Sequence, residues 1–397
     1  MKQFDITYFY GPESDHIVTD EVVARIADAK ITLAQLCYTP EINKIALKLM
    51  KKYGIRADVG DPRISRLYHE NDLLHADEIV RKVVEDYAAF DNVEGFDICD
   101  EPGSDRFEIL KAIVSAFKKY APDRETVINL FPNYATPEQL RDKDYSSHLE
   151  RFVKVVKPHF ISYDHYHFMG RPIETAVDNS TDERERMIRA SAHTTVDRGG
   201  FFQNIEEIRR VGLKNDLEQM LIVLLIEHGP YRNLTYAELM WEVNMCLAYG
   251  FHRISYFTYW TPPHDDFWRW TNAMCDRDGN RNQHWYDVQS INSRILPIGK
   301  LLFDTKSSAV FHIGTPEAGA KRFDGYGKIH SIEGERAVIG FFENGLIYLV
   351  NRDYQNENTL KLSADGKLQR FDGSNFISCE KTLTLPAGEG VLLKMDN

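Results

Sequence analysis

Two acidic residues stand where a pair of catalytic carboxyl groups would be expected, because each directly follows an apolar run of the sequence. Glu101 lies in the segment DEPG at positions 100–103, and Glu227 follows the run 220–226. Two carboxyl groups about 5–5.5 Å apart can cleave a glycosidic bond with retention of configuration, since one protonates the leaving oxygen while the other attacks the anomeric carbon. The pattern therefore predicts Glu101 as a general acid and Glu227 as a nucleophile.

Both residues also have a structural interpretation. The segment 100–103 could be a solvated turn that caps the helix after it, because acidic residues are common at helix starts. Glu227 could instead pair with Arg232. Glu238 and Glu242 compete with Glu227 for the role of nucleophile, but both fall within a helical pattern, so we expect them to be structural.

Polar or aromatic side chains follow several other strand-like runs. Hydroxyl, carboxylate, amide and imidazole groups suit the recognition of a polyol, and the flat face of a tryptophan suits a sugar ring. We therefore predict substrate contacts for Tyr10, Asp61, Asp100, Asn129, Asp164, His165, His167 and Trp260. Surface loops have a similar composition, so an ordinary loop role is the alternative for each of them.

A metal site is the alternative interpretation of the run that ends at His165 and His167. The two residues would share a face of a strand, and such a pair can ligate zinc. Metal-dependent barrel hydrolases carry the pair after their first strand, whereas here Tyr10 and Gly11 follow the first strand and offer no ligand. We expect no metal. The lack of phosphate- and dinucleotide-binding glycine motifs leads us to expect no organic cofactor.

Short apolar runs alternate with amphipathic segments over the first 300 residues. Eight runs are expected as strands: 6–10, 31–36, 55–59, 93–99, 126–131, 160–165, 221–226 and 253–259. Strands that alternate with helices form parallel sheets, and eight such units close a (β/α)8 barrel, or TIM barrel. Active sites in such barrels lie at the carboxyl ends of the strands. Glu101 and Glu227 would then face each other from the ends of the fourth and seventh strands.

The pattern changes after a last helical segment at about 284–302. Short runs separated by turn signals follow at 337–342, 346–351, 359–362, 369–371 and 390–394. We therefore predict an α/β chain with two domains, a catalytic barrel over residues 1–303 and a small antiparallel β-sandwich over residues 304–397. We expect the β-sandwich to pack against the barrel and to carry no chemistry.

The chain resembles the large glycoside hydrolase clan, of clan-A type, whose acid/base and nucleophile are both Glu on strands 4 and 7. The matching features are Glu101 followed by Pro102, Glu227, and Trp260 after the eighth strand. The stretch 231–260 resembles the β-galactosidase-type branch. The resemblance implies a retaining mechanism, a Trp that floors the terminal sugar subsite, and a role in carbohydrate metabolism. Asp100 departs from the pattern, because the clan usually has an Asn there that binds the sugar 2-hydroxyl.

Composition disfavours several other functions. The formal net charge of −12 and the absence of a basic run argue against nucleic-acid and anionic-membrane partners. No apolar run approaches the roughly 18 residues that cross a bilayer. The five cysteines show no paired spacing, and the first residues show no signal-peptide pattern. We expect a cytoplasmic protein, with secretion as the alternative if a leader has been trimmed.

The expected partner is a carbohydrate, and we favour a neutral β-linked glycoside. An insertion at about 170–200 could close the site, and its arginines could equally contact an acidic sugar or a second copy in a homo-oligomer. Partial burial and the charges of Asp100 and Glu227 are expected to raise the pKa of Glu101 and keep it protonated. The alternatives are a metal-dependent hydrolase and a sugar-binding barrel without catalysis.

Overall fold

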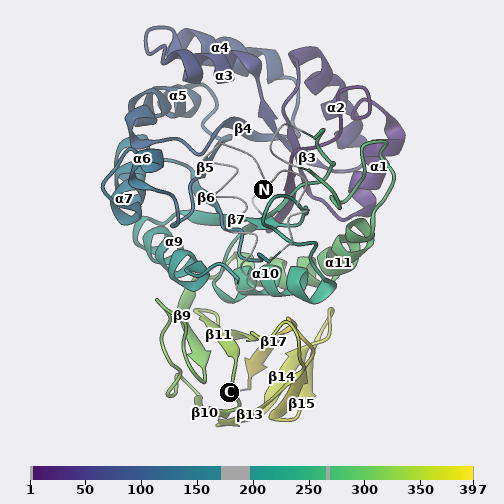
Figure 1. Cartoon of the computed structure of the whole chain (residues 1–397), viewed down its shortest axis with the longest axis vertical. Coiled ribbons are helices and arrows are strands. Elements are labelled where there is room, and N and C mark those ends of the chain that lie inside the picture. The colour runs from purple at the N-terminus through teal and green to yellow at the C-terminus, as the bar shows by residue number, and fades with distance from the viewer. Residues whose placement is uncertain (1–2, 171–196, 265–268, 397) are drawn as a thin grey trace, which may run out of the picture.

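Eight parallel strands form a barrel at the centre of the computed structural model, which describes residues 3–170, 197–264 and 269–396 (Figure 1). Neighbouring strands follow the order β1-β8-β7-β6-β5-β4-β3-β2. The strands are β1 (Asp5–Phe9), β2 (Leu33–Leu36), β3 (Arg56–Gly60), β4 (Val93–Asp100), β5 (Glu125–Leu130), β6 (Phe160–Asp164), β7 (Glu218–Leu224) and β8 (Arg253–Phe257). The predicted (β/α)8 barrel is confirmed, and each predicted strand overlaps one of these eight.

Thr32 closes the barrel between β1 and β2. Its N–H donates to the carbonyl oxygen of Ile6 at 2.9 Å, and its hydroxyl oxygen accepts from the N–H of Ile6 at 3.0 Å. The same hydroxyl donates to the carboxylate of Asp5 at 2.7 Å. A side chain thus supplies part of the hydrogen bonding between the first and second strands.

Helices surround the barrel (Figure 1). They are α1 (Asp20–Asp28), α2 (Pro40–Lys52), α3 (Pro62–Glu70), α4 (Ala76–Tyr87), α5 (Phe107–Tyr120), α6 (Pro137–Leu140), α7 (Tyr145–Val156), α9 (Phe201–Asn215), α10 (Tyr236–Ala248) and α11 (Gln283–Phe303). Local signals fix some of their starts. Thr235 caps α10, since its hydroxyl accepts from the N–H of Glu238 while the Glu238 carboxylate accepts from the N–H of Thr235. Glu238 therefore has the structural role that the helical pattern predicted.

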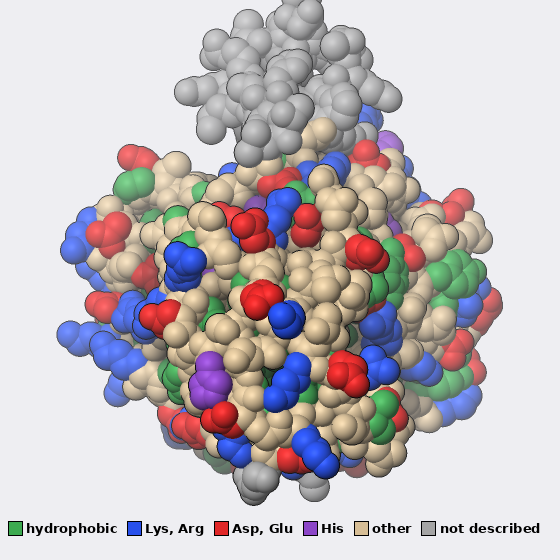
Figure 2. All heavy atoms as spheres, turned by 90° about the horizontal axis from the view of Figure 1, so that it is seen from below, with side chains coloured by type: hydrophobic (Ala, Val, Ile, Leu, Met, Phe, Trp, Pro, Cys, Tyr) green, Lys and Arg blue, Asp and Glu red, His purple; other side chains and the backbone are tan. Residues whose placement is uncertain are grey.

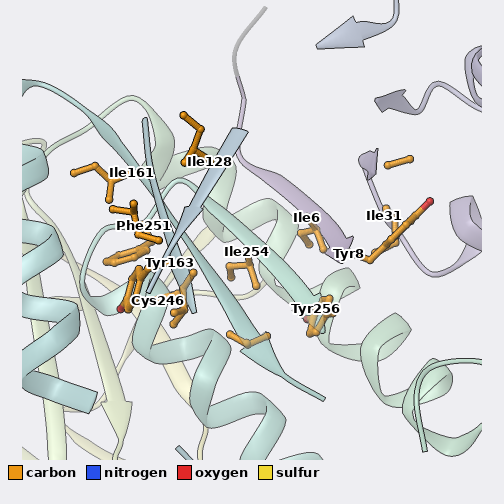
Figure 3. Packing of buried hydrophobic residues seen from close by; sticks show 14 of the residues in the cluster. Ile6, Tyr8, Ile31, Ile128, Ile161, Tyr163, Cys246, Phe251, Ile254 and Tyr256 are labelled. Atoms are coloured by element: carbon orange, nitrogen blue, oxygen red, sulfur yellow. The ribbon is translucent and has the colours of Figure 1, made fainter. Parts of the chain in front are cut away.

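The main hydrophobic core lies between the strands and the surrounding helices. Figure 3 shows Ile6 and Tyr8 of β1 with Ile254 and Tyr256 of β8 among its members. The residues between them point to the opposite face, the barrel interior, because successive side chains of a strand alternate. Full burial of each apolar side chain stabilises the fold by about 1.5–3 kcal/mol.

The amino ends of the strands bring charged side chains together as pairs. The guanidinium of Arg253 donates to the carboxylate of Glu125 at 2.7 Å, and Arg56 forms ion pairs with Asp5 and Glu94. Asp5, Glu125 and Arg253 are at most 4% exposed. Charges so deeply buried are tolerated when they are paired, and each arginine here neutralises acidic neighbours.

Two antiparallel sheets follow the barrel, in the strand orders β15-β14-β17-β12-β11-β9 and β10-β13-β16. The strands are β9 (Ser307–Ile313), β10 (Ile329–Glu333), β11 (Ala337–Phe342), β12 (Leu346–Asn351), β13 (Asn358–Ala364), β14 (Leu368–Phe371), β15 (Phe376–Cys379), β16 (Thr382–Leu385) and β17 (Gly390–Met395). The predicted β-sandwich is confirmed. The sequence did not reveal β9, β10, β15 and β16, because β9 follows a helix closely and the other three lack a continuous apolar run.

The C-terminal sheets pack against α10. Val338, Val350 and other residues of the six-stranded sheet belong to the same core as the buried residues of this helix. Gly340 permits the close approach, because a Cβ there would lie 2.0 Å from the carbonyl oxygen of Ala248. The β-sandwich thus packs against the barrel, and the division into two domains at residues 303 and 304 stays a prediction.

The face that carries the C-terminal sheets shows Lys and Arg side chains interspersed with Asp and Glu (Figure 2). Among the helices that the structure describes, none is both long enough and apolar enough to cross a membrane. The insertion predicted at about 170–200 falls mainly on residues 171–196, which lie outside the described residues. Its proposed part in closing the site stays a prediction.

Candidate active site

Glu101 directly follows β4 and adopts a backbone conformation that is unfavourable for an L-residue. Its φ is +46°, and its N–H donates to the carbonyl oxygen of Asn129 at 2.8 Å. A left-handed conformation at a residue other than glycine costs about 1–3 kcal/mol, and such residues cluster at functional sites. The hydrogen bond to β5 holds Glu101 in this turn at the barrel mouth.

Asn129 of β5 joins Asp100 to Asp164. Its amide group donates to Asp100 Oδ1 at 2.9 Å and to Asp164 Oδ1 at 3.0 Å, while its oxygen accepts from the hydroxyl of Ser162 at 2.8 Å. The register of the sheet pairs Asp100 with Asn129 and Asn129 with Ser162. Strand register therefore assembles an acidic cluster, which we define as Asp100, Glu101 and Asp164.

The acidic cluster favours protonated carboxyl groups. Burial, and then the charges of Asp164 and Asp100, raise the pKa of Glu101 to about 9. Burial and the charge of Asp100 raise the pKa of Asp164 to about 7, although the hydrogen bond from Asn129 opposes this shift. Glu101 therefore holds a proton at neutral pH. The sequence suggested Asp100 and Glu227 as the charges that raise the pKa of Glu101. In the structure the two charges are Asp100 and Asp164 of β6.

Arg198 brings a positive charge to the same end of the barrel. Its guanidinium carbon lies 4.0 Å from the centre of the Tyr134 ring, and its Nη2 donates to the Tyr231 hydroxyl at 3.2 Å. Its charge opposes the rise in the pKa of Asp164. Burial raises the pKa of the Tyr166 phenol well above its usual value, and the charges of the acidic cluster add to this rise. Tyr166 therefore lies near the acidic cluster.

Glu227 lies three residues beyond the end of β7 and contacts the loop that follows β8. The hydroxyl of Thr271 and the amide of Asn272 donate to Glu227 Oε2 at 3.1 and 2.6 Å. The backbones of Glu227 and Thr271 exchange hydrogen bonds at 3.0 and 3.1 Å. Trp270, next in the loop, stacks on His228 with 4.4 Å between ring centres. These contacts fix the orientation of the Glu227 carboxylate.

The suggested pairing of Glu227 with Arg232 does not describe the contacts of Arg232 in this structure. Its guanidinium donates to Asp197 at 2.5 Å and to Glu238 at 2.7 Å. Arg232 thus joins the start of α10 to the segment after residue 196.

A cavity of about 450 Å³ opens where β1, β2 and β4 end, and its lining includes Tyr10, Glu13, Gln35, Tyr38 and Asp97. The amide of Gln35 donates to Asp97, and burial raises the pKa of Asp97 to about 6. The neighbouring charge of Asp100 adds to that rise, so the cavity adjoins the acidic cluster. Its lining contains two acidic residues and no basic one, which suits a neutral polyol better than an anion.

Two predicted contact residues take part in packing and capping. The side chain of Trp260 is 1% exposed, and a Cβ on Gly279 would lie 2.5 Å from its ring. Asp61 caps α3 by accepting from the N–H of Arg63 at 2.9 Å, and it forms an ion pair with the same guanidinium at 2.8 Å. An enclosed ring has no open face for a sugar, and the Asp61 oxygens already have donors. We leave both residues out of the proposed site.

The two histidines also contact protein groups. Nδ1 of His165 lies 3.1 Å from the Asn204 side-chain oxygen, and burial lowers the pKa of this imidazole to about 3. His167 donates from Nδ1 to the carbonyl oxygen of Arg198 at 2.7 Å, and its ring stacks on Trp241. Within residues 3–170, 197–264 and 269–396, no group of three or more His, Cys, Asp and Glu side chains is arranged to hold a metal.

Sequence reasoning found Asp100, Glu101, Asn129 and Asp164, but not Asp97, Arg198 or the loop 270–272. Asp97 carried a usable signal, because an acidic residue inside an apolar strand must face the barrel interior or the mouth. Arg198 and the loop 270–272 carried no usable sequence signal, because they lie in segments outside the strand pattern. Arg198 comes close to the acidic cluster, and the loop contacts Glu227.

Comparison with known proteins finds solved structures whose fold is similar to that of this chain. No family model matches the chain, and no curated protein matches its sequence. A β-galactosidase from Bacillus circulans sp. alkalophilus superposes with a TM-score of 0.65 at 9% identity over 100% of this chain and 99% of the other. A family 5 glycoside hydrolase from Bacteroides vulgatus gives 0.60 at 12% identity over 99% and 89%.

A β-galactosidase from the psychrophilic Marinomonas ef1 gives a TM-score of 0.52 at 10% identity over 77% of this chain. The chain spans 62% of the length of that enzyme. At such low identities these likenesses show the fold. The resemblance to a β-galactosidase-like barrel with a C-terminal β-sandwich is confirmed at that level.

Proposed function

We propose that this protein is a glycoside hydrolase in which Glu101 is the general acid. The observation that carries the proposal is a carboxyl group with a pKa of about 9 at the carboxyl end of β4, in a barrel mouth. An acid that must protonate a departing sugar oxygen has to hold its proton at working pH, and burial beside like charges achieves this. The solved structures that share the fold, described as glycoside hydrolases, support the same chemistry.

Glu227 is the proposed nucleophile, which makes the enzyme a retaining one. Its carboxylate is oriented by Thr271 and Asn272, and it follows β7 as the partner of an acid on β4 should. In the first step Glu101 protonates the leaving oxygen while Glu227 attacks the anomeric carbon. In the second step Glu101, now ionised, takes a proton from the water that hydrolyses the glycosyl–enzyme.

The proposed substrate is a neutral β-linked glycoside. The cavity next to Asp97 offers hydroxyl, amide and carboxylate groups to a sugar, and its two acids disfavour a uronic acid or a sulfated sugar. Trp270, which is half-buried beside the residues that hold Glu227, is the aromatic ring that we assign to sugar stacking in place of Trp260. Asp100 would contact the sugar where the related clan has an Asn.

Hydrolysis of a panel of aryl β-glycosides by the wild type, Glu101→Gln, Glu227→Gly and the exposed control Glu70→Gln tests the proposal. Loss of the general acid is expected to lower kcat/KM about 10²–10⁴-fold on substrates with poor leaving groups. Azide should restore part of the activity of Glu227→Gly, and NMR of the first product should show retained configuration.

Each part of the proposal has its own contrary result. Full activity of Glu101→Gln would remove the general acid, and an inverted product would remove Glu227 as nucleophile. Sugar binding without turnover in the wild type would favour the non-catalytic barrel instead.

A further inference from the structure

A tyrosine of the C-terminal region reaches the segment that carries Arg198. Tyr354 follows β12, and its hydroxyl donates to Asp197 Oδ2, while Arg232 binds the other oxygen of the same carboxylate. The Tyr354 ring also packs edge-on against Phe168 with 5.2 Å between ring centres. The contact therefore joins the C-terminal sheets to the carboxyl end of the barrel.

Asp197 is held on one side by these contacts, and its neighbour Arg198 is held on the other. The N–H of Arg198 donates to the carbonyl oxygen of His167 at 2.8 Å, and its Nε donates to the carbonyl oxygen of Tyr166 at 3.2 Å. With these bonds made, the guanidinium lies on the Tyr134 ring. A displacement of Asp197 would shift the adjoining peptide and with it the position of the guanidinium.

We propose that Tyr354 is a positioning residue for the active site: by holding Asp197, it keeps the guanidinium of Arg198 on the Tyr134 ring, from where its positive charge acts on Asp164 of the acidic cluster. The inference rests on the proposed function only for its effect on catalysis, since the contacts themselves are independent of turnover. It assigns to the C-terminal region a part in the chemistry that the sequence did not indicate.

The charged and titratable groups around the cluster define the expected effect. Glu101 faces Asp164 and Asp100, and Asp164 faces Asp100 and Arg198. Asp97 and the Cys99 thiol face Asp100, whose charge adds to the rise that burial causes in the pKa of each. The other titratable neighbours are phenols whose pKa burial raises and which are therefore neutral: Tyr134, Tyr145, Tyr163, Tyr166 and Tyr231. If the guanidinium moves away, Asp164 keeps its proton to higher pH. Glu101 releases its proton at a still higher pH, where Asp164 is already ionised, so the lower apparent pKa of the pair rises toward the upper one.

NMR titration of the carboxyl carbons in the full chain measures this without any substrate. Protein labelled with ¹³C at the Glu and Asp side chains, with signals assigned through Glu101→Gln and Asp164→Asn, gives the two apparent pKa values of the coupled pair. Arg198→Met should bring them closer together by about one unit, and Tyr354→Phe should do the same to a smaller extent. Tyr326→Phe, at a partly exposed tyrosine of the C-terminal region, is the matched control and should leave both values in place.

The double variant Tyr354→Phe/Arg198→Met decides whether Tyr354 acts through Arg198. Its two pKa values should equal those of Arg198→Met alone, because a lost contact cannot misplace a guanidinium that is already absent. Unchanged values in Tyr354→Phe, or additive shifts in the double variant, would overturn the inference. If the wild type proves inactive on glycosides the proposed function fails, yet the titration still tests the role of Tyr354.

Discussion

The two ends of the barrel use similar acidic residues in opposite ways. At the amino end, Arg253 pairs with Glu125, and Arg56 pairs with Asp5 and Glu94. At the carboxyl end, Asp100, Glu101 and Asp164 stand together, and the group that bridges two of them is the neutral amide of Asn129. Neutralised charges stabilise the base of the barrel. Burial and then the like charges at the mouth oppose ionisation and raise the pKa of Glu101.

The difference shows what each end can do. Buried ion pairs contribute little chemistry, because an acid held by an arginine releases its proton early and cannot donate it at neutral pH. The acidic cluster pays in stability for keeping Glu101 protonated, which is the expected signature of a functional site. Substitutions at the amino end should therefore lower the stability of the fold. Substitutions in the acidic cluster should change its proton affinity and, with it, the pH dependence of stability.

Removal of the arginine at the amino end should have the largest effect on stability. Arg253→Met leaves Glu125 buried without its cation, and it also removes the positive charge that opposes the rise that burial causes in the pKa of Asp58. Breaking a buried pair in this way costs about 3–5 kcal/mol in the free energy of unfolding. Urea unfolding at pH 7 measures it, with the exposed Arg81→Met as the control, for which no measurable loss is expected.

A double variant keeps this test informative if Arg253→Met fails to fold. Arg253→Met/Glu125→Gln removes both charges of the pair, so it should recover part of the lost stability. If Arg253→Met lost as little unfolding free energy as Arg81→Met, the charge pairs would not be what stabilises the amino end of the barrel.

Glu101→Gln should raise the free energy of unfolding, whereas Arg253→Met should lower it, because the carboxyl end keeps a buried acid protonated at the expense of stability. The folded-state pKa of Glu101, about 9, lies above the value of 4.5 usual for a free glutamic acid. The stability that its protonated form provides is complete below pH 4.5 and is lost as the pH rises toward 9, since the unfolded chain ionises first. The variant should exceed the wild type by about 1–3 kcal/mol near pH 8 and match it near pH 4.

Thermal unfolding across this pH range, under matched buffers, measures the difference. Glu78→Gln is the control of opposite sign, because a hydrogen bond from Lys82 lowers the pKa of Glu78 in the folded protein. That variant should fall below the wild type at high pH. An equal difference between Glu101→Gln and the wild type at pH 4 and pH 8 would contradict the raised pKa of Glu101.

Asp164→Asn should have the smallest effect of the three substitutions, a shift in the pKa of Glu101. The asparagine can still accept the hydrogen bond from Asn129, but one negative charge beside Glu101 is gone. The pKa of Glu101 should fall by about one unit, which equals 1.4 kcal/mol. If the proposed function holds, the basic limb of kcat/KM moves to lower pH by the same amount. Asp97→Asn, in the lining of the cavity, should move this limb less. Equal shifts in the two variants would contradict the assignment of Asp164 as the charge beside Glu101.

Much of the site followed from strand counting. Glu101 and Asn129 could be placed because apolar runs mark strands, and the residues that follow them collect at one end of a parallel barrel. Their mutual contacts could not be predicted, because these depend on the register that sets Asn129 between Asp100 and Ser162. The environment of Trp260 was hidden for a related reason: its place after β8 was visible, but the glycine close to its ring and the burial of the side chain were not.

The sequence by itself determined the eight strand–helix units, the change to short strands after the last helix, and the acidic residue at the end of the fourth strand. Those features are local, because periodicity, capping and turn residues act over a few positions. Only the tertiary structure decided which charges surround Glu101, that Thr271 and Asn272 hold Glu227, and that Tyr354 reaches Asp197 from 157 residues away. Such contacts join distant segments, and their strength depends on burial and distance, which no local pattern records.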